Sequence, residues 1–520
     1  MQMAESCPFD VTPYKVTNNV NRPTAVNLNY TNQDFWSMKS RLLTYIQQNF
    51  SDNFSDFVES SIAIMLVENW AFIADTLSFK IDQIANEIFI DTVTEIDNAF
   101  RLAGLVGYKP LPPVASKCMW TARINTAQIN NVEIPAPFDV QITNGNQSVN
   151  YELYPADSFN RPIFDESIII SAGKLVNSNV VGLQGQTVTD SFLGTGTTNQ
   201  SFLLSSLPVL LGSVRVYVNG EQWNQVDFFT DSQPRKEYRI EYKSDYSLYV
   251  IFGNNRAGLC PSLNATINAT YRVGGGPIGD IVTNAASIDA LISIPNQASS
   301  IIVNFTNYTK GENGYSGDGV EDIRRKLPFY IKSQERAVTG EDYKTLCNQF
   351  STPYNGTTGK ATVALRHSGC SANIIEVFVL VKDGQDGLKL ASSQFKAEML
   401  DYLDAKKMIT DNICIRDGLV VYVQVSVAVI INNFYKPFED RIKSQIQNSL
   451  NIFFNLNNWD YGQTLKQTDV VKALNNVTEP NSYDISLVTV TDSKSVPLVT
   501  TRYFEIIRPY GDVQITFEYE

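Results

Sequence analysis

The feature that most restricts the fold of this chain is a single apolar stripe between residues 62 and 88. Large apolar side chains recur there at intervals of 4, 4, 3, 4, 4, 3 and 4 residues. At about 100° per residue they share one helical face about 100° wide. The pattern also repeats every 11 residues, about 3.67 residues per turn, which keeps the seam nearly straight. The residues of the stripe are Ile62, Leu66, Trp70, Ile73, Leu77, Ile81, Ile84 and Ile88.

A helix of this length without an internal glycine or proline is typical of a bundle or a coiled coil. Two interpretations stay open. The stripe is either the core face of a helix packed within its own domain or the seam of an intermolecular bundle with partner helices. Glu68, Asn69 and Asp75 interrupt the apolar run well short of the roughly 20 residues that a membrane span needs, so no transmembrane segment is expected.

Neighbouring patterns extend this helical region into a bundle domain over residues 30–110. A capping-box-like Thr31-x-x-Asp34 predicts the start of the first helix. Gly107 predicts the end of the third helix, because glycine readily takes the left-handed conformation that follows a helix. Residues 1–29 are rich in Pro, Asn and Thr and show no period, which predicts an extended arm that is ordered only against something else.

After residue 110 the pattern changes, and the whole chain reads as an α+β multidomain protein. Short alternating apolar runs and a hairpin signal at Asn219-Gly220 predict a β-rich domain over 111–310. A helical connector is expected over 311–355. Strands alternating with amphipathic helices over 356–520 predict an α/β C-terminal domain, similar to a ferredoxin-like unit and ending in terminal strands. Its clearest element is the alternating strand at 419–431.

Composition excludes several classes of function. The formal net charge is −13 and the pI about 4.8, with no dense basic cluster, so no direct nucleic-acid partner is expected. The chain has a single histidine, His367, so a His-x-x-x-His metal pair is excluded and a Ser-His-Asp triad would depend on that one residue. None of the six cysteines forms a C-x-x-C pair. No catalytic, cofactor-binding or metal-binding residue is predicted.

Two glycine-rich stretches need a separate explanation. The run YRVGGGPIGD at 271–280 contains a literal G-x-G-x-x-G, but Pro277 and a β-branched continuation replace the helix that would hold a pyrophosphate. We therefore interpret it as a sharp exit from a strand. The loop 382–388 places Asp383 and Asp386 among glycines without the ligand spacing of an EF-hand, which favours a turn over a weak cation site.

Several motifs in sequence order resemble the baseplate J-like family, the baseplate wedge proteins of contractile-tailed bacteriophages. Each motif alone is weak, and together they cover most of residues 30–490. The chain differs from the usual residues of the family at Asn254-Asn255 and at Asp280, and neither residue type has a catalytic role that the difference would remove. The matching stretches are Asn86–Thr92 with Arg101–Pro110, Val216–Gly220, Phe252–Gly258, Tyr271–Gly276 with Gly279-Asp280, Arg336–Tyr343 and Asp460–Leu465.

The resemblance implies a structural subunit without enzymatic activity or cofactor. Such proteins join helical wedge partners and further copies of themselves into six wedges, which close into a ring around the hub and tube. Host recognition loosens the ring and the sheath contracts. The resemblance also implies that the 62–88 stripe joins an intermolecular bundle, that hub, tube and sheath are neighbours, and that the protein assembles in the host cytoplasm and resides in the virion tail.

Two alternatives stay open. A baseplate component of a tailocin or secretion system would share the same physics in another biological setting. A glycan-binding or glycan-processing tail protein would use the β-rich middle region and the acidic loops.

Overall fold

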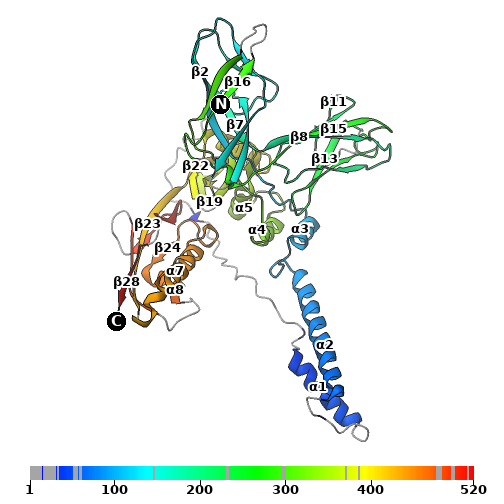
Figure 1. The fold of residues 1–520 in the computed structure, drawn as a ribbon, viewed down its shortest axis with the longest axis vertical. Coiled ribbons are helices and arrows are strands. Elements are labelled where there is room, and N and C mark those ends of the chain that lie inside the picture. The colour runs from blue at the N-terminus through cyan, green and yellow to red at the C-terminus, as the bar shows by residue number, and fades with distance from the viewer. Residues whose placement is uncertain are drawn as a thin grey trace. The chain divides into compact units, whose positions relative to one another are not determined.

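The structure is a computed structural model, and it forms two compact units. One comprises residues 20–110 and 318–331, and the other comprises residues 1–19, 111–317 and 332–520. The fold class is confirmed in coarse form as mixed helix and sheet, with helices in the N-terminal region and a mostly β middle region (Figure 1). The residues that the structure describes are 14–15, 31, 34–50, 57, 61–144, 147–229, 234–293, 300–368, 372–384, 387–431, 433–475, 483–492, 498–511 and 514–519.

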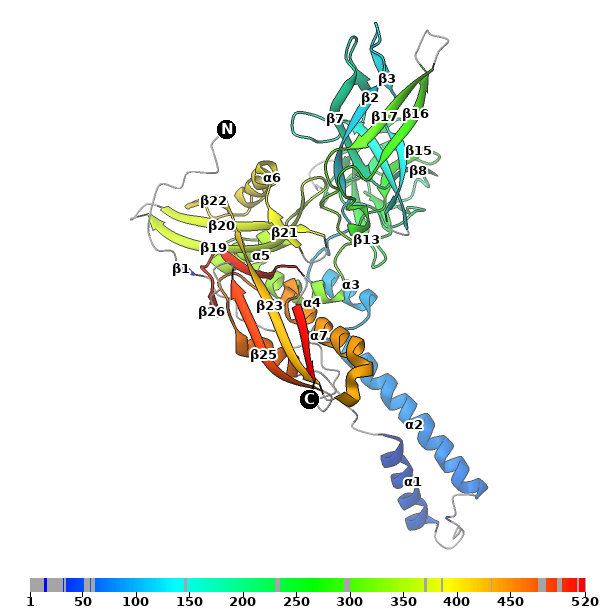
Figure 2. The ribbon, with the colours of Figure 1, turned by 60° about the vertical axis from the view of Figure 1, so that its left-hand side comes forward.

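The smaller unit is helical and begins with an antiparallel hairpin of α1 and α2 (Figure 1 and Figure 2). Thr31, just before α1, donates from its backbone N and its hydroxyl to the Asp82 carboxylate, both at 2.9 Å. Further along the hairpin, Lys39 Nζ lies 2.7 Å from Glu68 Oε1. Its helices are α1 (Phe35–Asn49), α2 (Ile62–Glu87), α3 (Ile96–Leu105) and the greater part of α4 (Val320–Ser333).

A second cluster in this unit joins α3 to α4, although more than 200 residues separate them. Gly107, at φ +79°, ends α3, and the Tyr108 N–H then donates to the Ala103 carbonyl at 3.0 Å. Buried Asp318 accepts from the Tyr108 hydroxyl at 3.1 Å and from Lys326 at 2.6 Å, so its charge is paired. The apolar core comprises Val93, Ala99, Ala103, Tyr108, Ile323 and Leu327.

The larger unit starts with an antiparallel sheet in the order β16-β17-β2-β7-β5-β4, accompanied by a β3–β6 pair. β17 alternates buried and more exposed residues, as a strand with one face on a core requires, whereas β7 ends in a run of five buried residues. The strands are β2 (Lys117–Ile124), β3 (Val132–Ile134), β4 (Phe138–Asn144), β5 (Gln147–Pro155), β6 (Ile168–Ile170), β7 (Val176–Gln184), β16 (Ser287–Ser293) and β17 (Ser300–Asn307).

Residues 186–273 form a second β core that is inserted between β7 and β16. Two four-stranded sheets, β11-β10-β15-β8 and β12-β13-β14-β9, enclose this core as a sandwich. The alternating sequence pattern of residues 111–310 does not distinguish this second β core from the first. The strands are β8 (Gln186–Leu193), β9 (Ser201–Leu203), β10 (Arg215–Val218), β11 (Glu221–Gln222), β12 (Asn224–Gln225), β13 (Glu237–Tyr242), β14 (Leu248–Phe252) and β15 (Thr266–Val273).

The chain leaves and re-enters the first core at two touching glycine positions. Gly185 has φ +112° and Gly274 φ +133°, and a Cβ on Gly274 would lie 2.9 Å from the Gly185 Cα. Gly275 follows at φ +97°, where a Cβ would lie 2.8 Å from Leu210 Cδ2. Side chains are excluded here by both conformation and space. The glycine run at 271–280 is thus a strand exit, as predicted.

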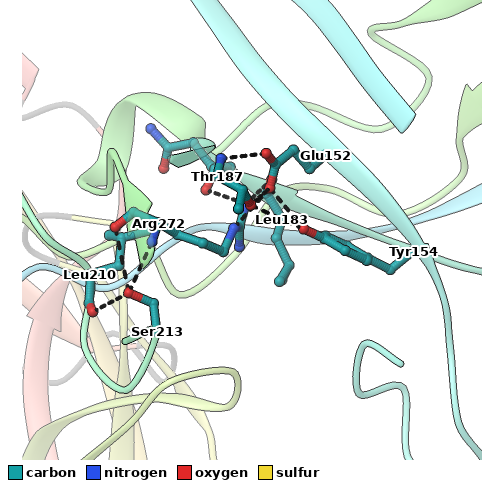
Figure 3. A network of polar contacts seen from close by, with 8 residues as sticks. Glu152, Tyr154, Leu183, Thr187, Leu210, Ser213 and Arg272 are labelled. Carbon is teal, nitrogen blue, oxygen red and sulfur yellow. Dashed lines mark hydrogen bonds and ion pairs between the residues drawn. The ribbon is translucent and has the colours of Figure 1, made fainter. Parts of the chain in front are cut away.

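A buried polar network ties the two β cores together beside this crossing (Figure 3). Arg272 Nε lies 2.9 Å from Glu152 Oε2, and their side chains are only 6% and 3% exposed. Arg272 Nη2 also donates to the Leu183 carbonyl at 3.0 Å. Glu152 accepts from the Tyr154 hydroxyl at 2.9 Å and from Thr187 Oγ1 at 2.8 Å. A buried ion pair needs such additional partners because desolvation of both charges is costly.

The third core is an α/β layer built on β19 and β20, which lie side by side in Figure 2. β22 pairs with β20 in parallel, and β1 of the N-terminal arm pairs with β19 through Tyr14↔Leu365. The elements are β1 (Tyr14–Lys15), α5 (Gly340–Gln349), β18 (Ser351–Thr352), β19 (Gly356–Ser368), β20 (Ala372–Asp383), β21 (Gly387–Leu390), α6 (Ser393–Asp404) and β22 (Asp411–Asp417).

The last core is organised around the long strand β23. β25 pairs with β23 antiparallel, whereas β27 and then β28 pair with it in parallel, one after the other. Helices α7 and α8 supply the rest of the core. The elements are β23 (Leu419–Ile431), α7 (Glu439–Phe453), β24 (Thr464–Lys466), α8 (Gln467–Asn475), β25 (Tyr483–Asp492), β26 (Leu498–Thr500), β27 (Glu505–Pro509) and β28 (Gln514–Tyr519).

Candidate interaction surface

The face of α2 that packs against α1 consists mostly of small and polar side chains. Its buried positions recur at intervals of 7, 7 and 8 residues, close to the heptad spacing of an ordinary two-helix seam. Small side chains allow the two backbones to approach, and α1 contributes the larger apolar groups Phe35, Met38, Leu42 and Ile46, all half-buried. The buried α2 residues are Ile64, Ala71, Ser78 and Asn86.

The predicted stripe lies on the other side of α2 and is open to solvent. Seven of its residues belong to α2 and Ile88 follows directly as the C-cap. Their exposed fractions run from 45% for Ile73 to 74% for Ile62. Within the described part of the chain no element covers them. We call this set the α2 ridge: Ile62, Leu66, Trp70, Ile73, Leu77, Ile81, Ile84 and Ile88.

α2 also has a second exposed apolar row, which the sequence analysis above does not predict. Met65, Phe72 and Phe79 are each more than half exposed. They recur every seven residues, a signal that the 11-residue repeat of the ridge overshadows. On α1, Trp36 is 69% exposed and Lys39 Nζ lies 5.5 Å from the centroid of its ring. The helical hairpin therefore presents two apolar rows and an aromatic side chain.

The carboxylate of Glu87, at the C-terminal end of α2, has a structural role. Glu87 accepts from the Thr94 N–H at 2.9 Å, from the Thr94 hydroxyl and from Asn98 Nδ2 at 3.0 Å. Burial raises the pKa of Glu87, but these donors lower it by more, so its pKa lies below the ordinary value. The charged carboxylate thereby fixes the turn that leads into α3.

α2 is long and apolar enough to cross a membrane, judged by length and composition alone. Two of its acidic side chains are engaged on the hairpin face, Glu68 with Lys39 and Asp82 with Thr31. Acidic groups at such positions are costly in hydrocarbon. The expectation that this segment does not span a membrane stays a prediction.

The remaining motifs do not assemble a chemical site in the part of the chain that the structure describes. Asp383 of the 382–388 loop lies 3.0 Å from Lys310, while Asp386 lies outside the described residues. The helix after the glycine run is only the three-residue Pro277–Gly279, too short to present an anion site. The His367 side chain is also outside the described set. Among described residues, no group of three or more His, Cys, Asp or Glu side chains could hold a metal ion.

The most exceptional feature of the described residues is the exposed apolar face of α2, and an exposed face of this kind marks a contact surface. Residues 34–105 match the family model described as "Bacteriophage baseplate protein, N-terminal domain". That segment contains α1, α2 and α3, and with them the whole α2 ridge.

No curated protein matches the chain. Among solved structures, a chain of the "Cryo-EM structure of the anti-feeding prophage (AFP) baseplate, 6-fold symmetrised" is similar over 93% of this chain and 95% of that chain, with 11% identity and a TM-score of 0.33. A likeness this distant carries no functional weight.

The family match confirms the resemblance to baseplate proteins that the motifs predict. Residues 34–105 thus carry the N-terminal domain of a bacteriophage baseplate protein, and this match supports a structural role for the chain in a phage-like tail baseplate.

Proposed function

We propose that the protein is a wedge subunit of a contractile-tail baseplate and that the α2 ridge is its seam with partner helices. The observation that carries the proposal is the exposure of all eight ridge residues on a helix whose opposite face is already occupied by α1. An apolar face of this kind on a soluble protein marks a protein–protein or membrane contact.

The spacing of the ridge favours a helix as the partner. Knobs at 3- and 4-residue intervals fit between the side chains of a facing helix and match neither the period of a strand nor a flat surface. The 11-residue repeat keeps the ridge nearly straight over 27 residues, so the partner needs a comparably long apolar face. Helical wedge proteins and further copies of this chain meet that requirement.

The ridge offers enough energy for a stable contact. Complete burial of one large aliphatic side chain contributes roughly 1.5–3 kcal/mol. The ridge residues are about half to three-quarters exposed, so each has about 1 kcal/mol still to gain, or roughly 8 kcal/mol gross in total. Ordering costs reduce this figure, and neighbours such as Phe72 and Phe79 add to it.

We further propose that six wedges close into a ring around the hub and that loosening of the ring triggers sheath contraction. Moving a two-state assembly from 1:99 to 99:1 requires about 5.5 kcal/mol of differential contact energy, which a few interface residues can supply without a bound nucleotide. In this role the chain needs no enzymatic activity and assembles in the host cytoplasm before it enters the virion.

The predicted division at residues 29, 110, 310 and 355 belongs to the same proposal, with 356–520 as a ferredoxin-like unit. The separate apolar cores of the larger unit support a division into parts, and limited proteolysis followed by mass spectrometry would locate the accessible junctions.

The decisive experiment locates the chain in the intact particle. A compact protein label fused to the chain should give extra density that repeats sixfold around the baseplate ring, close to the tube, in averaged images of whole tails. Density on fibres, on the sheath or along the tube would refute the wedge assignment. Release of sugars from host polysaccharide by the purified chain would favour the glycan-processing alternative instead.

A further inference from the structure

The segment between α4 and α5 holds its backbone in a conformation that its own residues disfavour. Gln334 and Glu335 directly follow α4 with φ of +48° and +58°. The left-handed region costs free energy for every residue that carries a Cβ. In the described part of the chain ten non-glycine residues have positive φ, and seven of the other eight are asparagines. Gln334 and Glu335 are the adjacent pair in this set.

The same residues have a strong preference for helix. Gln334, Glu335, Arg336 and Ala337 are all good helix formers, and they continue the chain directly from α4, which ends at Ser333. Local preference alone would carry α4 one turn further. A conflict between local preference and the observed conformation marks a place where tertiary contacts hold the chain.

Those contacts are centred on Ala337. Its side chain is 1% exposed and belongs to the core of the third α/β layer. Its N–H donates to the Lys406 carbonyl at 3.1 Å, and it forms a parallel bridge with Lys407. Two residues later, Thr339 starts α5 through a reciprocal capping box with Asp342. The docking of Ala337 therefore requires the left-handed conformation of the two residues Gln334 and Glu335, and we call this docked contact the latch.

We propose that the α4–α5 joint is a two-state switch. In the latched state, seen here, Ala337 is docked on Lys406–Lys407 and the preceding pair is left-handed. In the extended state, α4 gains one turn through Ala337, about 5.4 Å of helix, and the bridge is released. Ile323 and Leu327 of α4 are buried in the core of the helical unit, so the joint lies on the chain path from that core to α5. This inference concerns the chain alone and does not depend on the wedge assignment.

Two opposed double substitutions at exposed positions of the full-length protein test the switch. Both remove the ion pair of Glu335 with Lys406 (4.0 Å) and the hydrogen bond from Arg336 to Gln334 (3.1 Å), so the two variants differ from each other only in backbone preference. The double variant Gln334→Gly and Glu335→Gly removes the left-handed penalty and disfavours helix, so it favours the latched state. The matched variant Gln334→Ala and Glu335→Ala keeps the penalty and favours helix, so it promotes the extended state. Asn264→Gly, at φ +62° in a distant turn, is the control.

The readout is the methyl resonance of Ala337 in the alanine-methyl-labelled protein, assigned with Ala337→Gly. A sparsely populated extended state gives relaxation dispersion at this methyl on the microsecond-to-millisecond scale. We expect the glycine variant to lower the extended population by about thirtyfold or more and the alanine variant to raise it about twofold. The control should change nothing. Absence of dispersion at Ala337 in all variants, or a change in the same direction in both double variants, would overturn the proposal.

Discussion

The double substitution Ile73→Asp and Ile84→Asp distinguishes an intermolecular seam from packing within the chain. Both positions belong to the α2 ridge, eleven residues apart on one line of the helix, and are 45% and 63% exposed. The hairpin face of α2 is formed instead by residues such as Ala71 and Ser78. A carboxylate at 73 or 84 therefore stays hydrated in the free chain, and far-UV circular dichroism and the melting temperature should change little.

The same change is severe once the ridge is covered. Each substitution forfeits about 1 kcal/mol of apolar burial. It also leaves an unpaired carboxylate in the seam, and an uncompensated buried charge costs about 3–5 kcal/mol. Even with partial hydration, the two sites together should weaken association by more than about 4 kcal/mol, a factor of about a thousand.

Sedimentation velocity of the purified full-length chain from about 0.1 to 100 μM measures this effect. Ordering costs leave only part of the gross burial energy of the ridge as binding free energy, so wild type should associate toward the upper end of this concentration range. The double aspartate variant should stay monomeric throughout. Asn69→Asp with Thr76→Asp is the matched control, because both positions are exposed on α2 outside the ridge.

Two results would contradict the assignment of the ridge as an intermolecular seam. If the aspartate variant associates like wild type, the ridge is not the seam. If it loses helix or melts early, the ridge is packed within the chain. The control variant should behave like wild type in both respects.

Four further outcomes are expected. Arg272→Met alone should lower the stability of the folded chain by about 3–5 kcal/mol, and adding Glu152→Leu should restore part of the loss, because breaking a buried pair costs more than replacing it; calorimetry of the single and double variants would contradict this if the two costs simply added. Gly275→Ala, which forces a Cβ into a site at φ +97°, should cost about 1–3 kcal/mol in thermal unfolding. Burial raises the pKa of Asp460, but the charges of Lys344, at 2.5 Å, and of Lys360 lower it by more, so its pKa lies below the ordinary value. The stability that this pair contributes is present above about pH 4 and is lost as pH falls through the lowered pKa. Acid-unfolding curves of Lys344→Met should lack that component. In flotation with neutral phosphatidylcholine vesicles the wild-type chain should stay in the aqueous fraction, and co-flotation would show that α2 enters lipid.

Much of the secondary structure was predictable because it depends on local periodicity. The 62–88 pattern predicts a helix, and α2 runs from Ile62 to Glu87. The alternation at 419–431 predicts a strand, and β23 has the same bounds. The sequence also indicates the strand exit at Gly274–Gly276, because proline and β-branched residues follow where a nucleotide-binding helix would begin.

Long-range relations were not predictable. The second β core is recognisable as an insertion only once Gly274, after β15, meets Gly185, after β7. The ion pair that joins the two cores links residues 120 positions apart. Likewise, the sequence does not show that Ala337, just after the end of α4 at Ser333, is docked on the Lys406 carbonyl. Pairing across such separations depends on which surfaces meet, and single-sequence patterns carry no record of that.

The α2 ridge shows the same contrast between predictable local structure and unpredictable packing within one helix. Side-chain spacing alone predicts a long helix with a straight apolar stripe over residues 62–88. The side of this helix that α1 covers depends on the folded structure. α1 covers the face with Ala71 and Ser78, where small side chains let two backbones approach, and the stripe stays open. Hydrophobicity alone gives the opposite answer, because it ranks faces by apolar area and takes no account of how closely two helices can pack.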